Sequence, residues 1–372
     1  QGEEACVNIL QENYLKALTI IDLIDSATAA YTSRLLDLNG SLKGYYLYHS
    51  DQILIATFGN SKTISEYLIT KYAYQCLNTD GLVPIGVGLL LNKNLFKSSK
   101  SRSENRKTIA EFLPLMQCKT NDDLEWALTI CALLNLRSTA QSLYLKYGQK
   151  SLKEGYLYES MNMFVNCYKP EENTSVNNHG MRELHRISWD LIFQDALLNS
   201  RPVQDELINN IVAKNVDPAF EVHPVIRQCI SPYAVLYEYF ESLKRQDNPD
   251  GMAKCSKLMH LLRFNFLPKK FFPLLLCQFI PIFKDLFYRF LFSDLIVIIE
   301  VLNEYDTMKE EDKEAAEILL KHSLDNVEKD ASSFDWRVVL KESGEEVGNV
   351  SAVIKLLRNE VSAKIGRVYI EQ

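Results

Sequence analysis

The sequence has 372 residues, of which 47% are apolar, so the chain can bury a sizeable hydrophobic core. It contains only 14 glycines and 11 prolines, too few for a sandwich or barrel built from many tight turns. The formal net charge of -7 argues against general nucleic-acid binding, for which a basic domain is expected.

Apolar residues recur every three or four positions along most of the chain, which is typical of amphipathic helices. The first such segment covers residues 1–39, where Asn39 and Gly40 form a helix stop signal. Because the pattern is already running at Gln1, the sequence is expected to be a fragment of a longer protein. The next stretch, SDQILIATFG, residues 50–59, is compatible with a helix or a strand.

Residues 61–81, SKTISEYLITKYAYQCLNTDG, form a clearer helix, with Ser61 or Thr63 as its cap and Gly81 after its end. The segment GLVPIGVG that follows has the Gly-x4-Gly spacing of a phosphate-binding loop. Val87, however, stands where such a loop needs lysine. A turn between helices is therefore the better interpretation.

The middle of the chain is interpreted as helices joined by short links. The basic run KSSKSRSENRK, residues 97–107, is expected to be a solvated loop, although contact with nucleic acid or a nuclear import signal is an alternative. The polar stretch at residues 169–180 is also expected to be a loop. The helices expected between these loops cover residues 107–116, 121–134, 137–147, 149–154 and 156–165.

The second half continues the helical pattern. Its expected elements are helices in residues 185–199, a proline-punctuated connector at 216–232, helix hairpins from 231 to 305, a charged helix at 309–330 and an amphipathic helix at 350–361. The apolar segment FFPLLLCQFIPIF, residues 271–283, is shorter than the roughly 18 residues of a membrane span and contains two prolines. A buried helix with breaks is expected there. The whole pattern predicts an all-α, irregular helical solenoid.

Signatures of catalysis and metal binding are absent from the sequence. There is no HExxH or GxSxG motif, and the six histidines are far apart in the chain. None of the eight cysteines forms a CxxC pair, so free buried thiols in a reducing compartment are expected. A catalytic triad assembled from distant residues stays open, but we expect no enzyme and no cofactor.

The stretch TNDDLEW, residues 120–126, contains three carboxylates, which could be a metal-binding cluster or the start of a helix. With Thr120 as the N-cap, Asp123 falls at the position from which it can complete a capping box. Acids in a first helical turn also interact favourably with the helix dipole. The sequence therefore predicts a helix start, followed by a body that is apolar on two faces and is buried between neighbours.

Two sets of apolar residues are candidate partner surfaces. The first contains four aromatic residues, for which core packing is the more frequent explanation: Phe271, Phe272, Phe287 and Phe290. The second lies on the last amphipathic helix, because little chain is left to cover it: Val353, Leu356, Leu357 and Val361.

Four segments resemble the fungal nucleoporin eighty-five family in the same order. They are IDLIDSATAAYTSRLLDL, TNDDLEWALTICALLNLRSTAQSLY, SPYAVLYEYFESLK and LLRFNFLPKKFFPLLLCQFIPIF. The resemblance covers roughly residues 20–300 and is weak in the last seventy or so. It implies a helical chain of the ancestral coatomer element type that folds back on itself into crown, trunk and tail.

The resemblance also implies a function and an organisation. The family builds the Y-shaped outer-ring coat of the nuclear pore complex at the nuclear envelope, and supports pore assembly, mRNA export and transport. Residues 1–115 would hold the later crown and the start of the returning trunk, residues 116–185 the returning trunk, and residues 186–372 the tail. A helical subunit of a vesicle coat or tethering complex is the alternative.

The partners that the resemblance implies are other proteins of the same complex. The tail would meet two other helical nucleoporins at the hub of the Y. A small β-propeller partner would bind through an N-terminal blade that matches nothing in this sequence. Direct nucleic-acid binding is not expected, and contact with the membrane would be indirect only.

Overall fold

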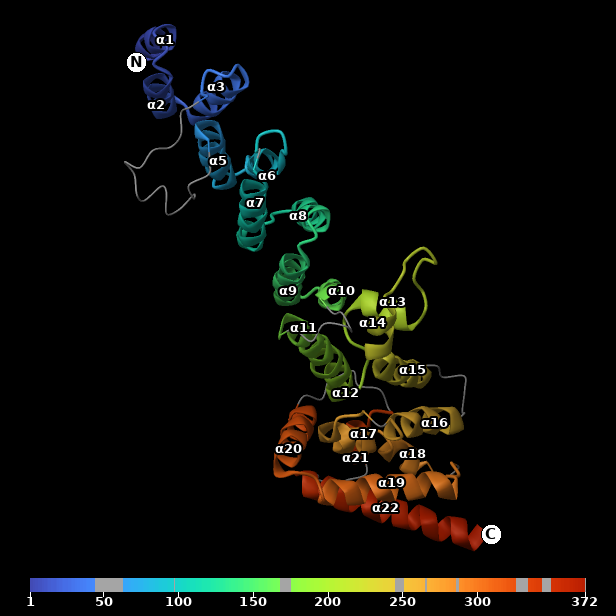
Figure 1. Cartoon of the computed structure of the whole chain (residues 1–372). Helices are drawn as coiled ribbons and strands as arrows, with labels where there is room; N and C mark the ends of the chain where they lie inside the picture. The colour runs from blue at the N-terminus through green and yellow to red at the C-terminus, as the bar shows by residue number, and fades with distance from the viewer. Residues whose placement is uncertain are drawn as a thin grey trace. The chain divides into compact units, whose positions relative to one another are not determined.

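The chain is helical throughout the part that the computed structural model describes. That part comprises residues 1–43, 63–96, 98–167, 175–244, 251–264, 266–285, 288–325, 334–342 and 349–371. These ranges contain helices and connecting loops but no β-strand (Figure 1). The predicted all-α class is thereby confirmed. The stretch 50–59, whose type the periodicity left open, lies outside the described residues.

The chain divides into two compact units, residues 1–143 and 144–372. The division falls within the long helix α9 (Arg137–Lys153). The other helices described in the first unit are α1 (Gly2–Leu10), α2 (Tyr14–Ile24), α3 (Ser26–Leu38), α5 (Ile64–Leu77), α6 (Val83–Leu91), α7 (Ser99–Phe112), the short η1 (Leu113–Leu115) and α8 (Asn121–Leu133). In this unit α1 packs on α2, α2 on α3, α3 on α5, α5 on α6, and α6 on α7. Packing between sequence neighbours is what an irregular helical solenoid predicts.

The first 39 residues form three helices rather than one continuous apolar face. Glu12 adopts a left-handed conformation with φ of 60° between α1 and α2. Asp25 then caps α3, since its carboxylate accepts hydrogen bonds from the backbone N–H groups of Ala27 and Thr28 at 3.2 and 2.9 Å. The predicted end of this segment is confirmed, because α3 ends at Leu38 and Gly40 has a φ of 80°.

The capped helix expected at residues 61–81 is confirmed as α5. Of the two candidate caps, Thr63 does the capping, since its hydroxyl accepts a hydrogen bond from the Glu66 N–H at 3.2 Å. The turn expected at GLVPIGVG is wrong, because helix α6 begins at Val83. Gly86 lies against α5: an added Cβ would lie 2.8 Å from the carbonyl oxygen of Ala73. This glycine permits close helix packing and does not mark a turn.

The predicted basic loop at residues 97–107 is also wrong, because Ser99 starts helix α7. Its buried stripe contains Ser101, Asn105 and Ile109, which recur every four residues. The first two are satisfied by hydrogen bonds: the Ser101 hydroxyl contacts the Glu66 carboxylate at 3.4 Å and the Asn105 amide donates to the Leu90 carbonyl at 3.1 Å. A buried face that is largely polar does not produce an apolar periodicity, so the sequence pattern missed this helix.

The second unit contains α10 (Leu157–Cys167), α11 (Ser175–Arg186), the π-helical segment η2 (Ile187–Phe193), α12 (Gln194–Asn199), α13 (Glu206–Val212), α14 (Pro224–Cys229), α15 (Ser231–Lys244), α16 (Gly251–Leu262), η3 (Lys269–Phe271), α17 (Phe272–Cys277), α18 (Ile280–Lys284), α19 (Phe292–Asp306), α20 (Glu310–Asp325), α21 (Trp336–Glu342) and α22 (Val350–Glu371). Two expectations fail here. The separate helices expected at 137–147 and 149–154 are one helix, α9, and residues 175–180 of the expected loop belong to α11. Residues 169–174 of that loop lie outside the described residues. The helices expected at 231–244 and at the C-terminus are confirmed.

The core of the second unit is centred on the apolar segment at residues 271–283. All six residues of α17 are buried, and Pro273 and Pro281 lie in the first turns of α17 and α18. The prediction of a buried helix with breaks is therefore confirmed. Helices α12, α16, α19, α20 and α22 all contact α17. Among the described residues no helix combines the length and apolar character needed to cross a membrane.

A buried ion pair connects three distant parts of this unit. Arg337 is 2% exposed and its guanidinium contacts the Asp335 carboxylate at 2.5 Å. The same guanidinium donates to the carbonyl oxygens of Leu198 and Asn199, both at 3.2 Å, and of Ser323 at 3.1 Å. These carbonyls lie in the last turns of α12 and α20, where a positive charge is favourable. Arg337 therefore links α21 to the preceding helix α20 and to the distant α12, and the second contact goes beyond the nearest-neighbour packing of a simple solenoid.

Candidate interaction surfaces

The acids at the start of α8 form a helix cap. The Asp123 carboxylate accepts hydrogen bonds from the backbone N–H groups of Thr120 and Lys119, both at 2.9 Å, and the Thr120 hydroxyl accepts one from the Asp123 N–H at 3.2 Å. The predicted capping box is confirmed. These hydrogen bonds, first of all the one from the Thr120 N–H, lower the pKa of Asp123 below its usual value of 3.8. The carboxylate is thus used to stabilise the helix end.

The body of α8 differs in part from the prediction. Leu124, Ala127 and Cys131 are buried, as expected for the first apolar stripe. In the second stripe Ile130 is buried, but Leu133 is 73% exposed. The helix is therefore packed mainly on one face and is not fully enclosed.

The cysteines have the environment of structural thiols. All eight are free; six are buried, while Cys6 is exposed and Cys229 is half-buried. Burial raises the pKa of Cys131 to about 11 and that of Cys167 to about 12, so these thiols stay protonated near neutral pH. Across the described ranges no group of three or more His, Cys, Asp or Glu side chains is placed to hold a metal ion.

The described members of the predicted aromatic surface are core residues. Phe271, Phe272 and Phe290 are all buried, and the Phe271 ring lies 5.3 Å from the ring of Phe193. Core packing, which the sequence already favoured for these residues, is therefore confirmed for them. Phe287 lies outside the described residues.

The residues predicted as an interface on the last helix also face the core. Val353 and Leu357 are 0% exposed, Val361 is 2% exposed and Leu356 is half-buried. Helix α22 packs on α17, α18, α19 and α20, so the chain itself covers the apolar face that was expected to be uncovered. Whether this helix also meets a partner is not decided by these contacts and stays a prediction.

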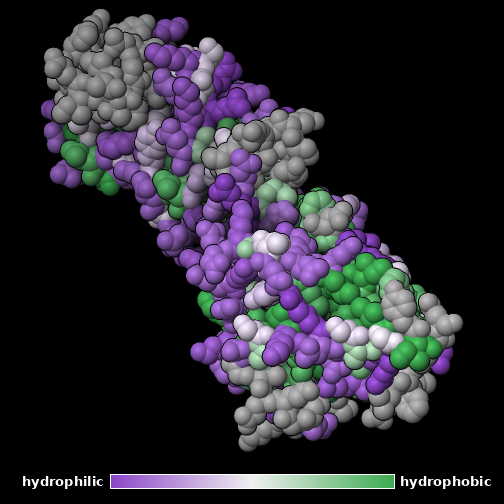
Figure 2. Space-filling model, turned by 90° about the horizontal axis from the view of Figure 1, so that it is seen from below, coloured by the Kyte–Doolittle hydropathy of each residue, from purple (hydrophilic) through white to green (hydrophobic). Residues whose placement is uncertain are grey.

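Exposed apolar side chains occur elsewhere on the second unit. Phe292 and Ile296, each 40% exposed, lie one turn apart on α19. Figure 2 shows hydrophobic residues, in green, gathered over part of the face that is seen from below, between hydrophilic residues. Exposed apolar areas of this kind mark interaction sites in many soluble proteins.

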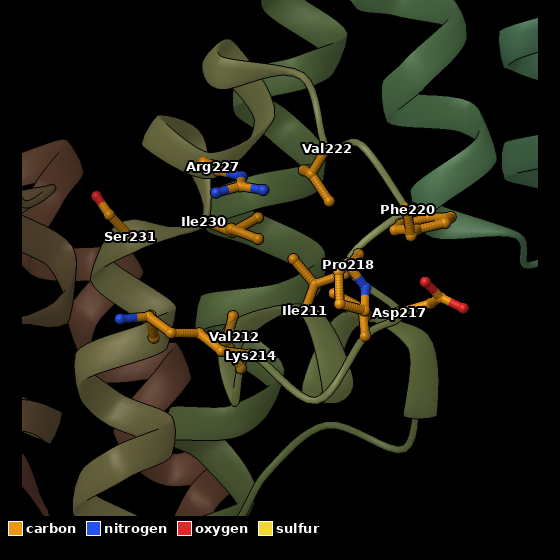
Figure 3. Close-up of a pocket in the computed structure, with 12 residues that line it drawn as sticks. Ile211, Val212, Lys214, Asp217, Pro218, Phe220, Val222, Arg227, Ile230 and Ser231 are labelled. Atoms are coloured by element: carbon orange, nitrogen blue, oxygen red, sulfur yellow. The ribbon is translucent and has the colours of Figure 1, made fainter.

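A groove between α13, α14 and α15 is a concave feature of the second unit. It has a volume of about 380 Å³ and is open to solvent on one side. Apolar residues dominate its walls, and Lys214, Asp217 and Arg227 are the charged residues among them (Figure 3). Sequence reasoning missed this groove, because it treated residues 216–232 only as a proline-punctuated connector.

The family relationship follows from the comparison with known sequences. Residues 1–304 match the sequence profile of the family described as Nup85 Nucleoporin. The chain belongs to the Nup85 nucleoporin family. The match ends near the start of the last seventy residues, where the resemblance seen in the sequence also becomes weak. It includes α3, α8, α15 and α17, which carry most of the four quoted segments.

Two fungal relatives within this Nup85 family are similar to the chain. Nucleoporin NUP85 of Saccharomyces cerevisiae is 27% identical over 348 residues, which cover 84% of this chain and 44% of the relative. Nucleoporin nup85 of Schizosaccharomyces pombe is 23% identical over 282 residues, which cover 74% of this chain and 36% of the relative. The chain thus spans less than half the length of the curated relatives it matches.

Proposed function

We propose that this chain is part of a structural scaffold subunit of the nuclear pore complex and acts through protein–protein contacts rather than catalysis. The family match over residues 1–304 carries the proposal, and both relatives are named as nucleoporins. The helical packing supports it, since stacked helices provide extended surfaces for partner proteins. The same match favours a nucleoporin over the alternative, a helical subunit of a vesicle coat or tethering complex.

The finer proposal concerns the place of the chain in the complex. We propose a position in the Y-shaped outer-ring coat at the nuclear envelope, where the subunit supports pore assembly, mRNA export and transport. In this proposal residues 1–115 are the later crown and the start of the returning trunk, residues 116–185 the rest of the returning trunk, and residues 186–372 the tail. The tail meets two other helical nucleoporins, and the β-propeller partner binds a blade that this sequence does not match.

Co-purification with the other two arms of the hub tests the proposal. The complete chain is expressed with the two arms, and a stable three-protein complex on size exclusion is expected. Stable capture by vesicle-coat subunits, without capture by the hub arms, would contradict it. A fluorescently tagged chain is expected to label the nuclear rim in a fungal cell, and diffuse cytoplasmic signal would contradict the proposed location.

The proposed partner contact on α22 needs a variant that leaves the core intact. Leu357 is fully buried, so an acidic residue there is expected to unfold the unit. Leu356 is half-buried, and Leu356→Asp is the better probe. Ser351→Asp, which adds the same charge at an exposed position of α22, is the matched control. If Leu356→Asp is folded and binds the hub arms as tightly as the control, α22 is not the contact.

A further inference from the structure

We propose that the groove between α13, α14 and α15 binds a short segment of a partner protein that presents an apolar side chain next to a carboxylate. The proposal is argued from the residues that line the groove. It does not depend on the scaffold function, because the same lining would bind the same peptide whichever complex contains the chain. It also assigns a binding site to a connector that the sequence analysis left without a role.

The groove has an apolar, fixed floor. Ile211, Val222 and Ile230 line it and are buried in the core of the second unit. Phe220 forms part of the wall, and its ring packs against the Tyr158 ring with centroids 5.3 Å apart. A preformed apolar concavity of about 380 Å³ is at the small end of the range for ligand sites, and suits one or two side chains.

Two basic residues and one acid line the groove. Lys214 and Arg227 are exposed, and neither has a hydrogen bond or ion pair to another side chain within the described part of the chain. Asp217 is the one acid of the lining, and its carboxylate accepts a hydrogen bond from the Ala219 N–H at 2.8 Å, which holds the loop. Figure 3 shows this carboxylate pointing away from both cations. Two unpaired cations beside an apolar surface are complementary to an apolar side chain next to an acid.

The backbone at Lys214 strengthens this interpretation. Helix α13 ends with Lys214 in the left-handed region, with φ of 58°, and the next N–H, that of Asn215, donates to the Asn210 carbonyl at 2.9 Å. Glycine is the residue that this position of a helix end favours. A lysine there is strained, and its charge at the groove is a reason for its presence.

The groove does not suit a nucleic acid. Sites for single-stranded nucleic acids combine a charged track along the backbone with exposed aromatic platforms. Here two cations are among the lining residues, and the aromatic residue of the lining, Phe220, already packs against Tyr158. An anionic membrane surface would likewise need a cluster of cations. A peptide is therefore the occupant that the lining favours.

A random peptide library displayed on phage and panned against the complete chain tests the proposal. Enriched peptides are expected to carry an aliphatic or aromatic residue adjacent to Asp or Glu. The best of them is synthesised with a fluorescent label, and its affinity is measured by anisotropy. The affinity is expected to fall as salt is added, since part of the contact is electrostatic.

Three variants locate the site. Lys214→Gly and Arg227→Gln each remove one charge and are expected to weaken binding by about three- to tenfold. Lys214→Gly also relieves the left-handed backbone, so this variant is expected to stay folded, which far-UV circular dichroism can check. Ala234→Phe is expected to fill the groove and abolish binding while both cations remain. Lys355→Gln, an exposed lysine on α22, is the matched control and should not change the affinity.

The outcomes are distinct. Enrichment of acidic, apolar peptides that lose affinity in the three groove variants but not in the control supports the proposal. No enrichment, enrichment of peptides without acids, or equal affinity for Lys214→Gly and the control overturns it. Sedimentation of the chain with phosphatidylserine vesicles that depends on Lys214, in place of peptide binding, would also overturn it. None of these experiments measures capture by the hub arms. The scaffold proposal is therefore tested independently, by the co-purification described above.

Discussion

Replacing Gly148 by alanine tests the helix packing at the centre of α9. An ideal Cβ at this position would lie 2.8 Å from Cε1 of Phe164 and 3.1 Å from two further ring atoms. Phe164 is fully buried on α10, so its ring has little room to move. Gly366, inside α22, offers a matched control because an added Cβ there would meet nothing within 4 Å. Both glycines are helical and both belong to the second unit.

The two substitutions are expected to have opposite signs. Alanine is more favourable than glycine by about 1 kcal/mol in a helix interior. For Gly366→Ala we therefore expect a gain of about 0.5–1 kcal/mol in the free energy of unfolding. At Gly148 overpacking costs about 1–3 kcal/mol and opposes the same gain. We expect Gly148→Ala to lower the free energy of unfolding by up to about 2 kcal/mol.

Urea unfolding followed by far-UV circular dichroism measures both effects. Trp189 and Trp336 lie in the second unit, whereas the third tryptophan, Trp126, lies in the first. With Trp126→Phe as the common background of all variants, tryptophan fluorescence follows the transition of the second unit. If Gly148→Ala is as stable as Gly366→Ala, the close contact between α9 and the Phe164 ring is refuted. A stability between that of the wild type and that of Gly366→Ala would show that the ring moves at small cost.

Three further predictions concern charges and thiols. Arg337→Met is expected to lower the free energy of unfolding by about 3–5 kcal/mol, because it leaves Asp335 buried and unpaired; adding Asp335→Asn should recover part of the loss, as urea unfolding would show. Because hydrogen bonds lower the pKa of Asp123, its ionised carboxylate stabilises the folded chain. This stabilisation is complete above pH 3.8 and is lost as the pH falls below that value. Wild type and Asp123→Asn should therefore converge in stability on acid titration followed by circular dichroism, and a constant difference would contradict this. Iodoacetamide should modify Cys6 in the native chain and Cys277 only after unfolding, since Cys6 is exposed and Cys277 is buried, as mass spectrometry can check.

Much of the fold could be predicted where the signal is local in the sequence. The capping box at Thr120 and Asp123 needs only two residues at the right spacing, and it is present as predicted. The buried segment at residues 271–283 follows from its length and from prolines that can begin a new helix. Such signals do not depend on what the helix packs against.

The failures have one physical cause, which is contact with a partner helix that the sequence does not reveal. Ser101 and Asn105 are buried because Glu66 and Leu90 satisfy them, and no apolar period marks α7. Helices were expected on either side of residue 148, yet α9 is continuous through Gly148, against which the Phe164 ring packs. On α22 the sequence did not reveal that other helices of the unit cover Val353, Leu357 and Val361, while the partner contact itself stays a prediction.

For the candidate sites, the sequence could show that the acids of α8 are not a metal site, but it could not reveal the groove. That the acids of α8 form a cap followed from their positions relative to Thr120. The groove could not be found, because Ile211, Val222 and Ile230 come from three segments of the chain and meet only in the folded unit. Its one local signal is Lys214, but a left-handed lysine cannot be recognised from the sequence alone.

Glycines inside helices and a lysine at a left-handed helix end both go against local sequence preferences, but they have different explanations in this chain. Gly86 and Gly148 are unfavourable for their helices, but each is explained by the neighbour that an added Cβ would meet. Lys214 is unfavourable for its helix end, and glycine would satisfy the same backbone without strain. Packing explains the glycines, whereas no hydrogen bond or ion pair of the Lys214 ammonium is found among the described residues. A residue that costs stability and is not needed for packing is expected to serve a contact outside the chain, and for this reason Lys214 is the position at which the groove proposal is most directly tested.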